Sequence, residues 1–257
     1  MTGTVRSTVV GTTAFVSFDR PALRNAMTFG MYEELEAACA GIRGNPAIRS
    51  AVFRGVGGQA FVAGTDIQQF RDFETAEDGV RYEARVDEII DAVESLPVPT
   101  LAVVEGFAMG GGFAIAIACD LRIATPDATF GYPIARTLGN CLSMANIQRL
   151  VASFGPSLAK RILLLADSID AETARDAHFL LDIVEREALD ARIAALCERL
   201  AGHAPLTIHA AKEAIRRNML SGVAEGVDLI EAVYGSADFH RGVEGFLAKK
   251  RPAWTGK

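Results

Sequence analysis

Two glycine-bearing segments could do chemistry with the backbone itself. In residues 61–66 (FVAGTD) the glycine permits a tight turn that leaves the next amide free to point into a cleft. The aspartate after it is placed to cap a following helix. In residues 105–113 (EGFAMGGGF) a strand ends and three glycines open a very apolar helix. Because helix N-termini present unpaired N–H groups and partial positive charge, both segments are natural sites for an anion or oxyanion.

The same glycines could instead serve only tight turns and close helix packing. A dinucleotide-binding fingerprint does not fit, because the second segment lacks GxGxxG spacing. Neither segment carries the Lys-Ser/Thr pair of a P-loop. Phosphate binding by these loops is therefore disfavoured. Two roles remain open for the glycine segments, an oxyanion site and a purely structural role.

The side chains with catalytic chemistry give a weaker signal. The four cysteines lie far apart and show neither CxxC nor Cys/His metal spacing, so no metal site is expected. Cys141 stands in an apolar run with no histidine close in sequence, which is typical of an inert core thiol. The histidines all fall in the helical C-terminal part, where surface or capping roles are the default. Carboxylates that follow the first glycine segment could supply a base: Asp72, Glu74 and Glu83.

The composition is that of a folded protein without the charge of a nucleic-acid binder. The chain has 257 residues, 50% of them hydrophobic, which allows a sizeable core in one large α/β domain or two small ones. The formal net charge is -6 and the pI is about 5.3, with no long Lys/Arg run, so nucleic acid is not an expected partner. The widely spaced cysteines suit reduced thiols in the cytoplasm. The first residues carry no pattern of an export signal or transit peptide.

Residues 100–119 are apolar enough to raise the question of a membrane span. They contain Glu105 and four glycines, and they run straight into Asp120 and Arg122. A buried strand, a turn and a buried helix fit this stretch better, so no membrane partner is expected.

Alternating strand and helix patterns predict an α/β core that positions the two glycine segments. The expected segments are a hairpin at 5–10 and 14–18, helices at 28–42 and 81–96, and buried strands at 51–54, 101–105 and 121–124.

The character of the sequence changes to mostly helical from Ser143 onward. We expect an α/β core over residues 1–200 and a helical C-terminal region over 201–257, joined as one continuous unit because no linker, repeat or low-complexity tract separates them. The helices expected in the second half are 144–154, 156–166, 186–201 and 208–220.

Several short motifs, in the right order and spacing, resemble the signatures of the enoyl-CoA hydratase/isomerase (crotonase) family. DRPALRNAM at residues 19–27 resembles the first signature, in which the residue before Asn lies near CoA. FVAGTD resembles the second, and GFAMGGG followed by CDLRIA resembles the third. AKE at 211–213 and EGFLAKKRP at 244–252 resemble the closing helices of the family. Because the match spans essentially the whole chain, the protein is identified as a member of this family.

The resemblance implies a crotonase-like spiral of ββα units with a helical C-terminal region that makes trimers, often paired into hexamers. It also implies that the amide N–H groups of Thr65 and Gly111 form an oxyanion hole for the thioester carbonyl of an acyl-CoA. Two preorganised donors in a dry site stabilise negative charge as it develops on that oxygen, so an enolate-like intermediate is expected. The expected partners are an acyl-CoA thioester and further copies of this chain, in a homotrimer or dimer of trimers. No cofactor is expected beyond the coenzyme A of the substrate.

The resemblance also places residues around the rest of the substrate. Arg24 and Lys249 are expected near the CoA phosphates and adenine, with Lys249 able to reach across from a neighbouring subunit. Gln68 departs from the pattern, since many relatives carry Lys at that position. The substrate-binding residues implied are Arg24, Ala26, Ala63, Asp66, Ile67, Gly110, Tyr132, Ile134, Asn140 and Lys249.

Two further departures concern the reaction itself. Hydratases of the family carry one glutamate two residues after the triple glycine and a second directly after F-G-x-P, and the pair positions water and shuttles its proton. Here those positions hold Ala114 and Ile134, and a shift of register by one residue offers only Ala135. The polar side chains left to line the pocket are Tyr132, Arg136, Thr137, Asn140, Cys141, Ser143 and Asn146.

Two classes of function therefore stay open. One is an acyl-CoA-processing enzyme, a lyase or isomerase as in fatty acid metabolism, whose reaction is hydration, double-bond isomerisation, decarboxylation or thioester hydrolysis. The other is a catalytically silent acyl-CoA-binding protein that kept the fold and lost both glutamates. The oxyanion motifs favour the first class, and the missing glutamates favour the second.

Overall fold

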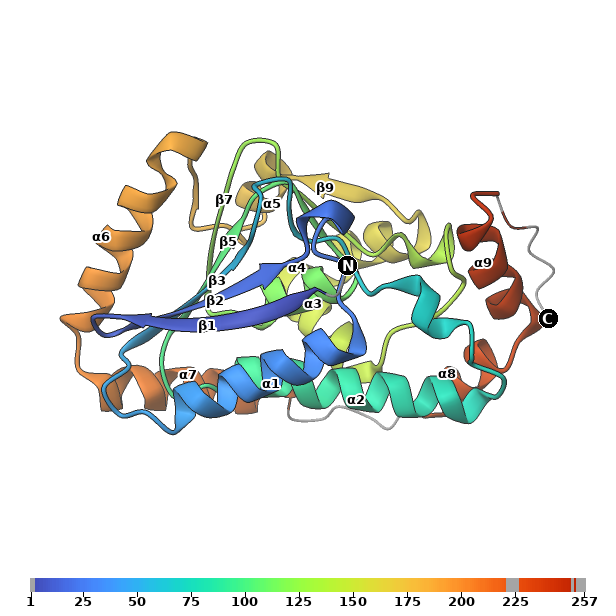
Figure 1. Cartoon of the computed structure of the whole chain (residues 1–257), viewed down its shortest axis with the longest axis horizontal. Coiled ribbons are helices and arrows are strands. Elements are labelled where there is room, and N and C mark those ends of the chain that lie inside the picture. Colours follow the sequence, from blue (N-terminus) through green and yellow to red (C-terminus); the bar gives the residue numbers. More distant parts are fainter. Residues whose placement is uncertain (1–2, 221–226, 251, 253–257) are drawn as a thin grey trace.

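The computed structural model describes residues 3–220, 227–250 and 252, and Figure 1 shows its helices packed around two β-sheets. The larger sheet begins with an antiparallel hairpin and continues with parallel strands. Its strands, in spatial order, are β1 (Thr4–Val10), β2 (Thr13–Asp19), β3 (Ser50–Gly55), β5 (Thr100–Val104), β7 (Leu121–Ala124) and β10 (Asp182–Ile183).

The smaller sheet carries both glycine segments. Its first three strands are parallel and the fourth is antiparallel to its neighbour. In spatial order they are β4 (Ala60–Val62), β6 (Phe107–Met109), β8 (Thr129–Gly131) and β9 (Ser168–Asp170). Because β4 and β6 run parallel side by side, the glycines that follow them come to the same edge of this sheet.

The helices cover both faces of the larger sheet. In Figure 1, α1 and α2 run side by side beneath β1 and β2, while α6 and α9 lie at opposite ends of the molecule. Short 3-10 turns, η1 (Pro21–Leu23), η2 (Ile67–Phe70), η3 (Pro133–Ala135) and η4 (Arg186–Ala188), lie between the main elements. The helices are α1 (Phe29–Arg43), α2 (Ala76–Glu94), α3 (Gly111–Ala118), α4 (Met144–Leu164), α5 (Ala171–Asp176), α6 (Leu189–Ala201), α7 (Pro205–Leu220), α8 (Val227–Tyr234) and α9 (Ala237–Leu247).

The central strand β5 shows why the parallel strands are apolar throughout. Successive side chains of a strand point to opposite faces. Ala102 and Val104 join the main core shared with α1, α2 and α3, whereas Leu101 and Val103 pack under α6. Both faces are covered, so the strand has no polar alternation.

Local signals set the helix boundaries. The Thr28 hydroxyl accepts from the Met31 amide at 3.1 Å and caps α1. α2 begins with a capping box between Thr75 and Asp78, five residues before the helical segment expected from the sequence. Inside α4, Gly155 has φ 67°, and this break separates the two helices that the sequence predicts there.

The longer predicted elements are confirmed, and the smaller sheet was missed. The hairpin, the helices at α1 and α2 and the buried strands β3, β5 and β7 lie where the sequence predicts them. Residues 100–119 form β5, β6 and α3, and within the described ranges no helix is long and apolar enough to cross a membrane. The division of the chain near residue 200 stays a prediction. Residues 221–226, Arg251 of the closing motif and 253–257 lie outside the described residues.

Candidate active site

Two glycine turns meet at the edge of the smaller sheet. Gly64 follows β4 with φ 115°, and Gly110 follows β6 with φ 52°, conformations that residues with a side chain rarely adopt. A Cβ built on Gly110 would lie only 3.6 Å from the Cα of Gly64. The two segments singled out in the sequence are therefore direct neighbours in space.

Within the part of the chain that the structure describes, the backbone geometry leaves one amide without an acceptor in each turn. Met27 and Thr65 form a parallel bridge in which the Met27 N–H donates to Gly64 O and the Asp66 N–H donates to Met27 O, both at 2.8 Å. In such a bridge the N–H of Thr65 itself points away from Met27. Gly111 is the first residue of α3, where an N–H has no acceptor within the helix. Both amides are available to a ligand where the turns meet.

A chain of hydroxyl groups holds the first turn in place. The Thr65 Oγ1 lies 2.8 Å from the Tyr32 hydroxyl on α1 and 2.9 Å from the Tyr82 hydroxyl on α2. Burial raises the pKa of Tyr32 to about 12, so this phenol stays neutral and able to donate. A Cβ added to Gly111 would lie 2.1 Å from the Tyr32 oxygen, so this hydroxyl packs directly against the second turn as well.

The motif at residues 19–27 also holds the first glycine turn in place, through hydrogen bonds and an ion pair. The Asn25 side chain, fully buried, donates to Val56 O at 3.0 Å and to Ala60 O at 2.8 Å, and accepts from the Arg20 amide at 2.9 Å. Arg20 also pairs with Asp66 at 2.8 Å. Asp66 caps η2 by accepting from the Gln68 amide at 3.1 Å, as its place in the sequence predicts.

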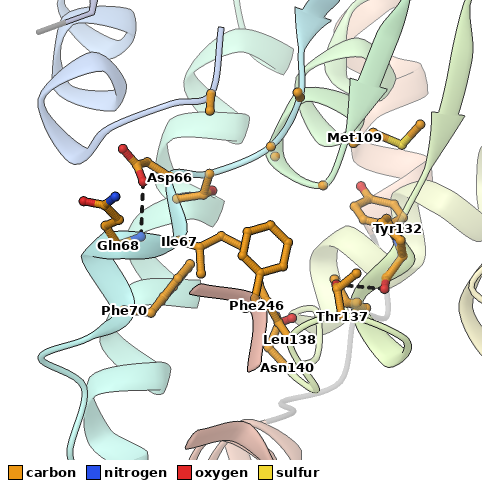
Figure 2. Close-up of a pocket in the computed structure, with 18 of the residues that line it drawn as sticks. Asp66, Ile67, Gln68, Phe70, Met109, Tyr132, Thr137, Leu138, Asn140 and Phe246 are labelled. Atoms are coloured by element: carbon orange, nitrogen blue, oxygen red, sulfur yellow. Dashed lines mark hydrogen bonds between the residues drawn. The ribbon is translucent and has the colours of Figure 1, made fainter. Parts of the chain in front are cut away.

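A cavity of about 750 Å³ opens beside the two free amides and is lined mainly by apolar side chains. Figure 2 shows Asp66, Ile67 and Gln68 on one wall, Met109, Tyr132 and Thr137 on the other, and the Phe246 ring from α9 between them. The structure brings to this cavity every residue that the resemblance implies for the oxyanion hole or for substrate binding: Arg24, Ala26, Ala63, Thr65, Asp66, Ile67, Gly110, Gly111, Tyr132, Ile134, Asn140 and Lys249.

Lys249 lines the cavity of its own chain, immediately after α9. The expectation that it can also reach across from a neighbouring subunit stays a prediction. The helices α8 and α9 pack against η2, so that Phe246 and Leu247 line the same cavity.

The hydratase positions lie at the cavity and carry no carboxyl group. Ala114 and Ile134 both line it, whereas Ala135, the residue offered by a shifted register, does not. Of the three candidate bases, Glu83 lines the cavity, while Asp72 and Glu74 are exposed and lie outside its lining.

The other polar candidates divide between the cavity and its surroundings. Burial raises the pKa of Cys141 to about 12, and this thiol does not line the cavity. The four histidines also lie away from it. Tyr132, Thr137, Asn140 and Asn146 line it, and Arg136, Cys141 and Ser143 do not.

Glu83 is a buried residue at the cavity to which the sequence gives little weight. Its side chain is 3% exposed, and burial raises its pKa to about 8, with the nearby charge of Asp87 adding to the effect. Two more buried polar atoms at the cavity, the Tyr132 hydroxyl and Asn140 Oδ1, have no hydrogen-bond partner among the described residues. Unpaired polar atoms in an apolar wall are suited to contact a polar group of a ligand.

Known proteins share this fold over nearly the whole chain. The solved methylmalonyl-CoA decarboxylase in complex with 2-nitronate-propionyl-CoA is similar with a TM-score of 0.90 at 26% identity, over 99% of each chain. This likeness confirms the predicted fold class, and the structure of an enoyl-CoA hydratase/carnithine racemase from Magnetospirillum magneticum agrees, with a TM-score of 0.81 at 29% identity over 100% of this chain and 97% of the other.

The sequence comparisons agree with the fold. Enoyl-CoA hydratase domain-containing protein 2, mitochondrial, from Mus musculus is 30% identical over 250 residues, which cover 94% of this chain and 84% of the mouse protein. The family model for enoyl-CoA hydratase/isomerase matches residues 9–257. With the motifs, the two glycine turns and this match over nearly its full length, the chain belongs to the enoyl-CoA hydratase/isomerase family.

Proposed function

We propose that the protein is an acyl-CoA thioester-processing enzyme in which the amides of Thr65 and Gly111 form an oxyanion hole for an enolate-like intermediate. The observation that carries this proposal is the meeting of two glycine turns, each with a free N–H, at the wall of a mostly apolar cavity. Donors fixed in such a site stabilise charge as it develops on a carbonyl oxygen, each by roughly 3 to 4 kcal/mol.

The rest of the cavity suits the other parts of an acyl-CoA. Arg24, with its guanidinium 4.9 Å from the centre of the Phe107 ring, and Lys249 supply positive charge for the CoA phosphates. The apolar wall around Ala114 and Ile134 suits an acyl chain. The similar decarboxylase was solved with a CoA thioester bound, which supports the same class of ligand here.

Water addition is the least supported of the candidate reactions. It uses two carboxyl groups on one side of the substrate, and Ala114 and Ile134 offer none. Double-bond isomerisation, decarboxylation and thioester hydrolysis each need the carbonyl activation that the two amides provide. A catalytically silent acyl-CoA-binding protein is the competing function, and the experiment below separates it from an enzyme.

Turnover is expected to depend on the fit between Gly111 and Tyr32. In Gly111→Ala the new methyl group meets the Tyr32 hydroxyl at 2.1 Å, which displaces the hydroxyl that holds Thr65 and so disturbs both donors. We expect a loss of about 100-fold or more in turnover, the size seen when one oxyanion donor is lost. The measurement is mass change and binding across a panel of acyl-CoAs, including a short enoyl-CoA.

The matched control is Gly41→Ala in α1, because a Cβ at Gly41 meets nothing within 4 Å. Adding Tyr32→Phe to Gly111→Ala removes the colliding oxygen, so part of the lost rate is expected to return. Full activity in Gly111→Ala would contradict the oxyanion hole. Tight binding by the native protein without turnover of any member of the panel would establish the silent binding protein instead.

We also propose the assembly that the resemblance implies, a homotrimer or a dimer of trimers. Exposed large apolar side chains at the end of α4 and on α7 support burial of these helices in a subunit contact. A monomer mass in sedimentation at micromolar concentration would contradict this assembly. The exposed side chains are Leu164, Leu165, Leu206 and Ile215.

Two further proposals come from the sequence alone. They are a cytoplasmic location and the lack of any cofactor beyond the coenzyme A of the substrate.

A further inference from the structure

Glu83 differs from the other carboxylate at the cavity. Asp66 is occupied, because it caps η2 and pairs with Arg20 at 2.8 Å. Glu83 projects from α2 among apolar and phenolic side chains, and none of the ion pairs formed by the described residues includes it. The cavity therefore contains one buried carboxyl group that is not neutralised by a cation.

Two hydrogen bonds fix the orientation of this carboxyl group. The Tyr234 hydroxyl on α8 donates to Oε1 at 2.5 Å, and the Ser143 amide donates to Oε2 at 3.2 Å. Glu83, Tyr234 and Ser143 are all nearly fully buried. A group held in this way keeps one geometry toward the cavity, which proton transfer to a bound substrate requires.

The charges around Glu83 come from several elements. Among the described residues, the cation that faces this region is Arg149 on α4, and its guanidinium is already paired with Glu94 at 3.0 Å. The other titratable groups that face it are Tyr82 and Asp87 on α2, Tyr32 on α1, Tyr132 and Cys141 after β8, and Tyr234 on α8.

We propose that Glu83 is the catalytic residue that moves a proton at the carbon next to the thioester carbonyl. This role rests on the proposed function, because it needs the thioester oxygen at the amides of Thr65 and Gly111. Glu83 on α2 then performs the proton transfer that Ala114 and Ile134 cannot perform, because neither side chain can donate or accept a proton.

The step balances within the site. A Glu83 carboxylate oxygen takes the α proton, and the C–H electron pair forms the carbon–carbon double bond of an enolate. The thioester oxygen gains the negative charge, which the two amides stabilise. The reverse step returns a proton to carbon and restores the carboxylate. Because the carboxyl proton exchanges with water between the two steps, deuterium from D2O enters the substrate.

The chemistry of its neighbours favours Glu83 for this work. Burial raises the pKa values of Tyr132 and Cys141 far above neutrality, so neither is a base at physiological pH. Burial raises the pKa of Glu83 only to about 8, close to the pH at which a general acid–base group works best. One carboxyl group suffices to remove and return a proton, which suits a double-bond shift or protonation of an enolate rather than addition of water.

The test is exchange of the α hydrogens of butyryl-CoA in D2O, followed by mass spectrometry, with binding measured on the same samples. Glu83→Gln keeps the shape of the side chain and removes the base, so the exchange rate is expected to fall by about 100-fold or more while butyryl-CoA still binds. The matched control is Glu88→Gln on the same helix, whose side chain is 65% exposed and pairs with Arg85. Its exchange rate is expected to stay at the native value.

The pH dependence identifies the titrating group. Only the carboxylate form removes a proton, so the native exchange rate rises with pH and levels off above about 8. Tyr234→Phe removes a hydrogen bond that favours the charged form, so it shifts this inflection to higher pH. A purely structural role of Tyr234 would lower the rate without moving the inflection.

The outcomes separate this role from the proposed function. Native protein that binds butyryl-CoA without exchanging it would overturn the enolate chemistry, and the role of Glu83 with it. Exchange at the native rate in Glu83→Gln would overturn only the role of Glu83 and leave the oxyanion hole in place. If Glu83→Gln does not fold, the pH profiles decide, because an inflection far from 8 that Tyr234→Phe leaves unmoved would equally overturn the role of Glu83.

Discussion

Replacing Gly112 with alanine is expected to destabilise the folded protein by more than about 3 kcal/mol. A Cβ at this position would lie 2.1 Å from the carbonyl oxygen of Val62 and 2.6 Å from its Cβ. Val62 is the last residue of β4 and is fully buried, so neither its carbonyl nor its side chain has room to move. The first turn of α3 must back away from the smaller sheet to accept the methyl group.

Urea unfolding of Gly112→Ala and the native protein measures this effect. Alanine is the better helix former by about 1 kcal/mol, so helix propensity alone predicts the opposite sign. Gly41→Ala in α1 isolates that propensity term, because it adds a methyl group into open space. Native stability in Gly112→Ala would mean that α3 can shift. The position of the Gly111 amide would then not depend on the close contact between Gly112 and Val62.

Replacing Arg149 with methionine is expected to cost about 3 to 5 kcal/mol of unfolding free energy. Arg149 on α4 is 2% exposed and pairs with Glu94 at 3.0 Å, and it lies 3.7 Å from Asp87. Methionine fills most of the space but leaves the buried Glu94 carboxylate without its cation. The loss comes from that uncompensated charge, not from a cavity.

A double variant and an exposed pair test this explanation. Arg149→Met with Glu94→Gln removes both charges, so it is expected to be more stable than Arg149→Met alone. Arg85→Met breaks the pair with Glu36, whose two side chains are 42% and 41% exposed, and is expected to cost less than about 1 kcal/mol. Equal losses in Arg149→Met and Arg85→Met, measured by denaturant unfolding, would contradict the role of burial.

The fold could be predicted where the sequence pattern is long. The helix α2 and the hairpin of β1 and β2 have enough residues for a period to show. The strands of the smaller sheet have three residues each, too few for any period. They pair across long sequence separations, and this pairing depends on the rest of the fold.

The candidate site likewise has features that could be predicted from the sequence and one contact that could not. The glycine turns could be predicted, because Gly64 and Gly110 occupy backbone conformations that other residues avoid. The signal for Glu83 was also in the sequence, since Val86 and Ile90 put it on the buried face of a helix, where a carboxylate is costly. Its partner Tyr234 comes from the other end of the chain, and no local pattern predicts that contact.

The closure of the cavity by both ends of the chain links ligand affinity to folding of the last helices. Ala22 and Arg24 line it together with Phe246 and Leu247 from α9. When α9 is undocked, the cavity loses the part of its wall that Phe246 and Leu247 form. Ligand that binds only the closed form adds its binding free energy to the docking of α9. The affinity of such a ligand is therefore expected to fall when α9 is undocked.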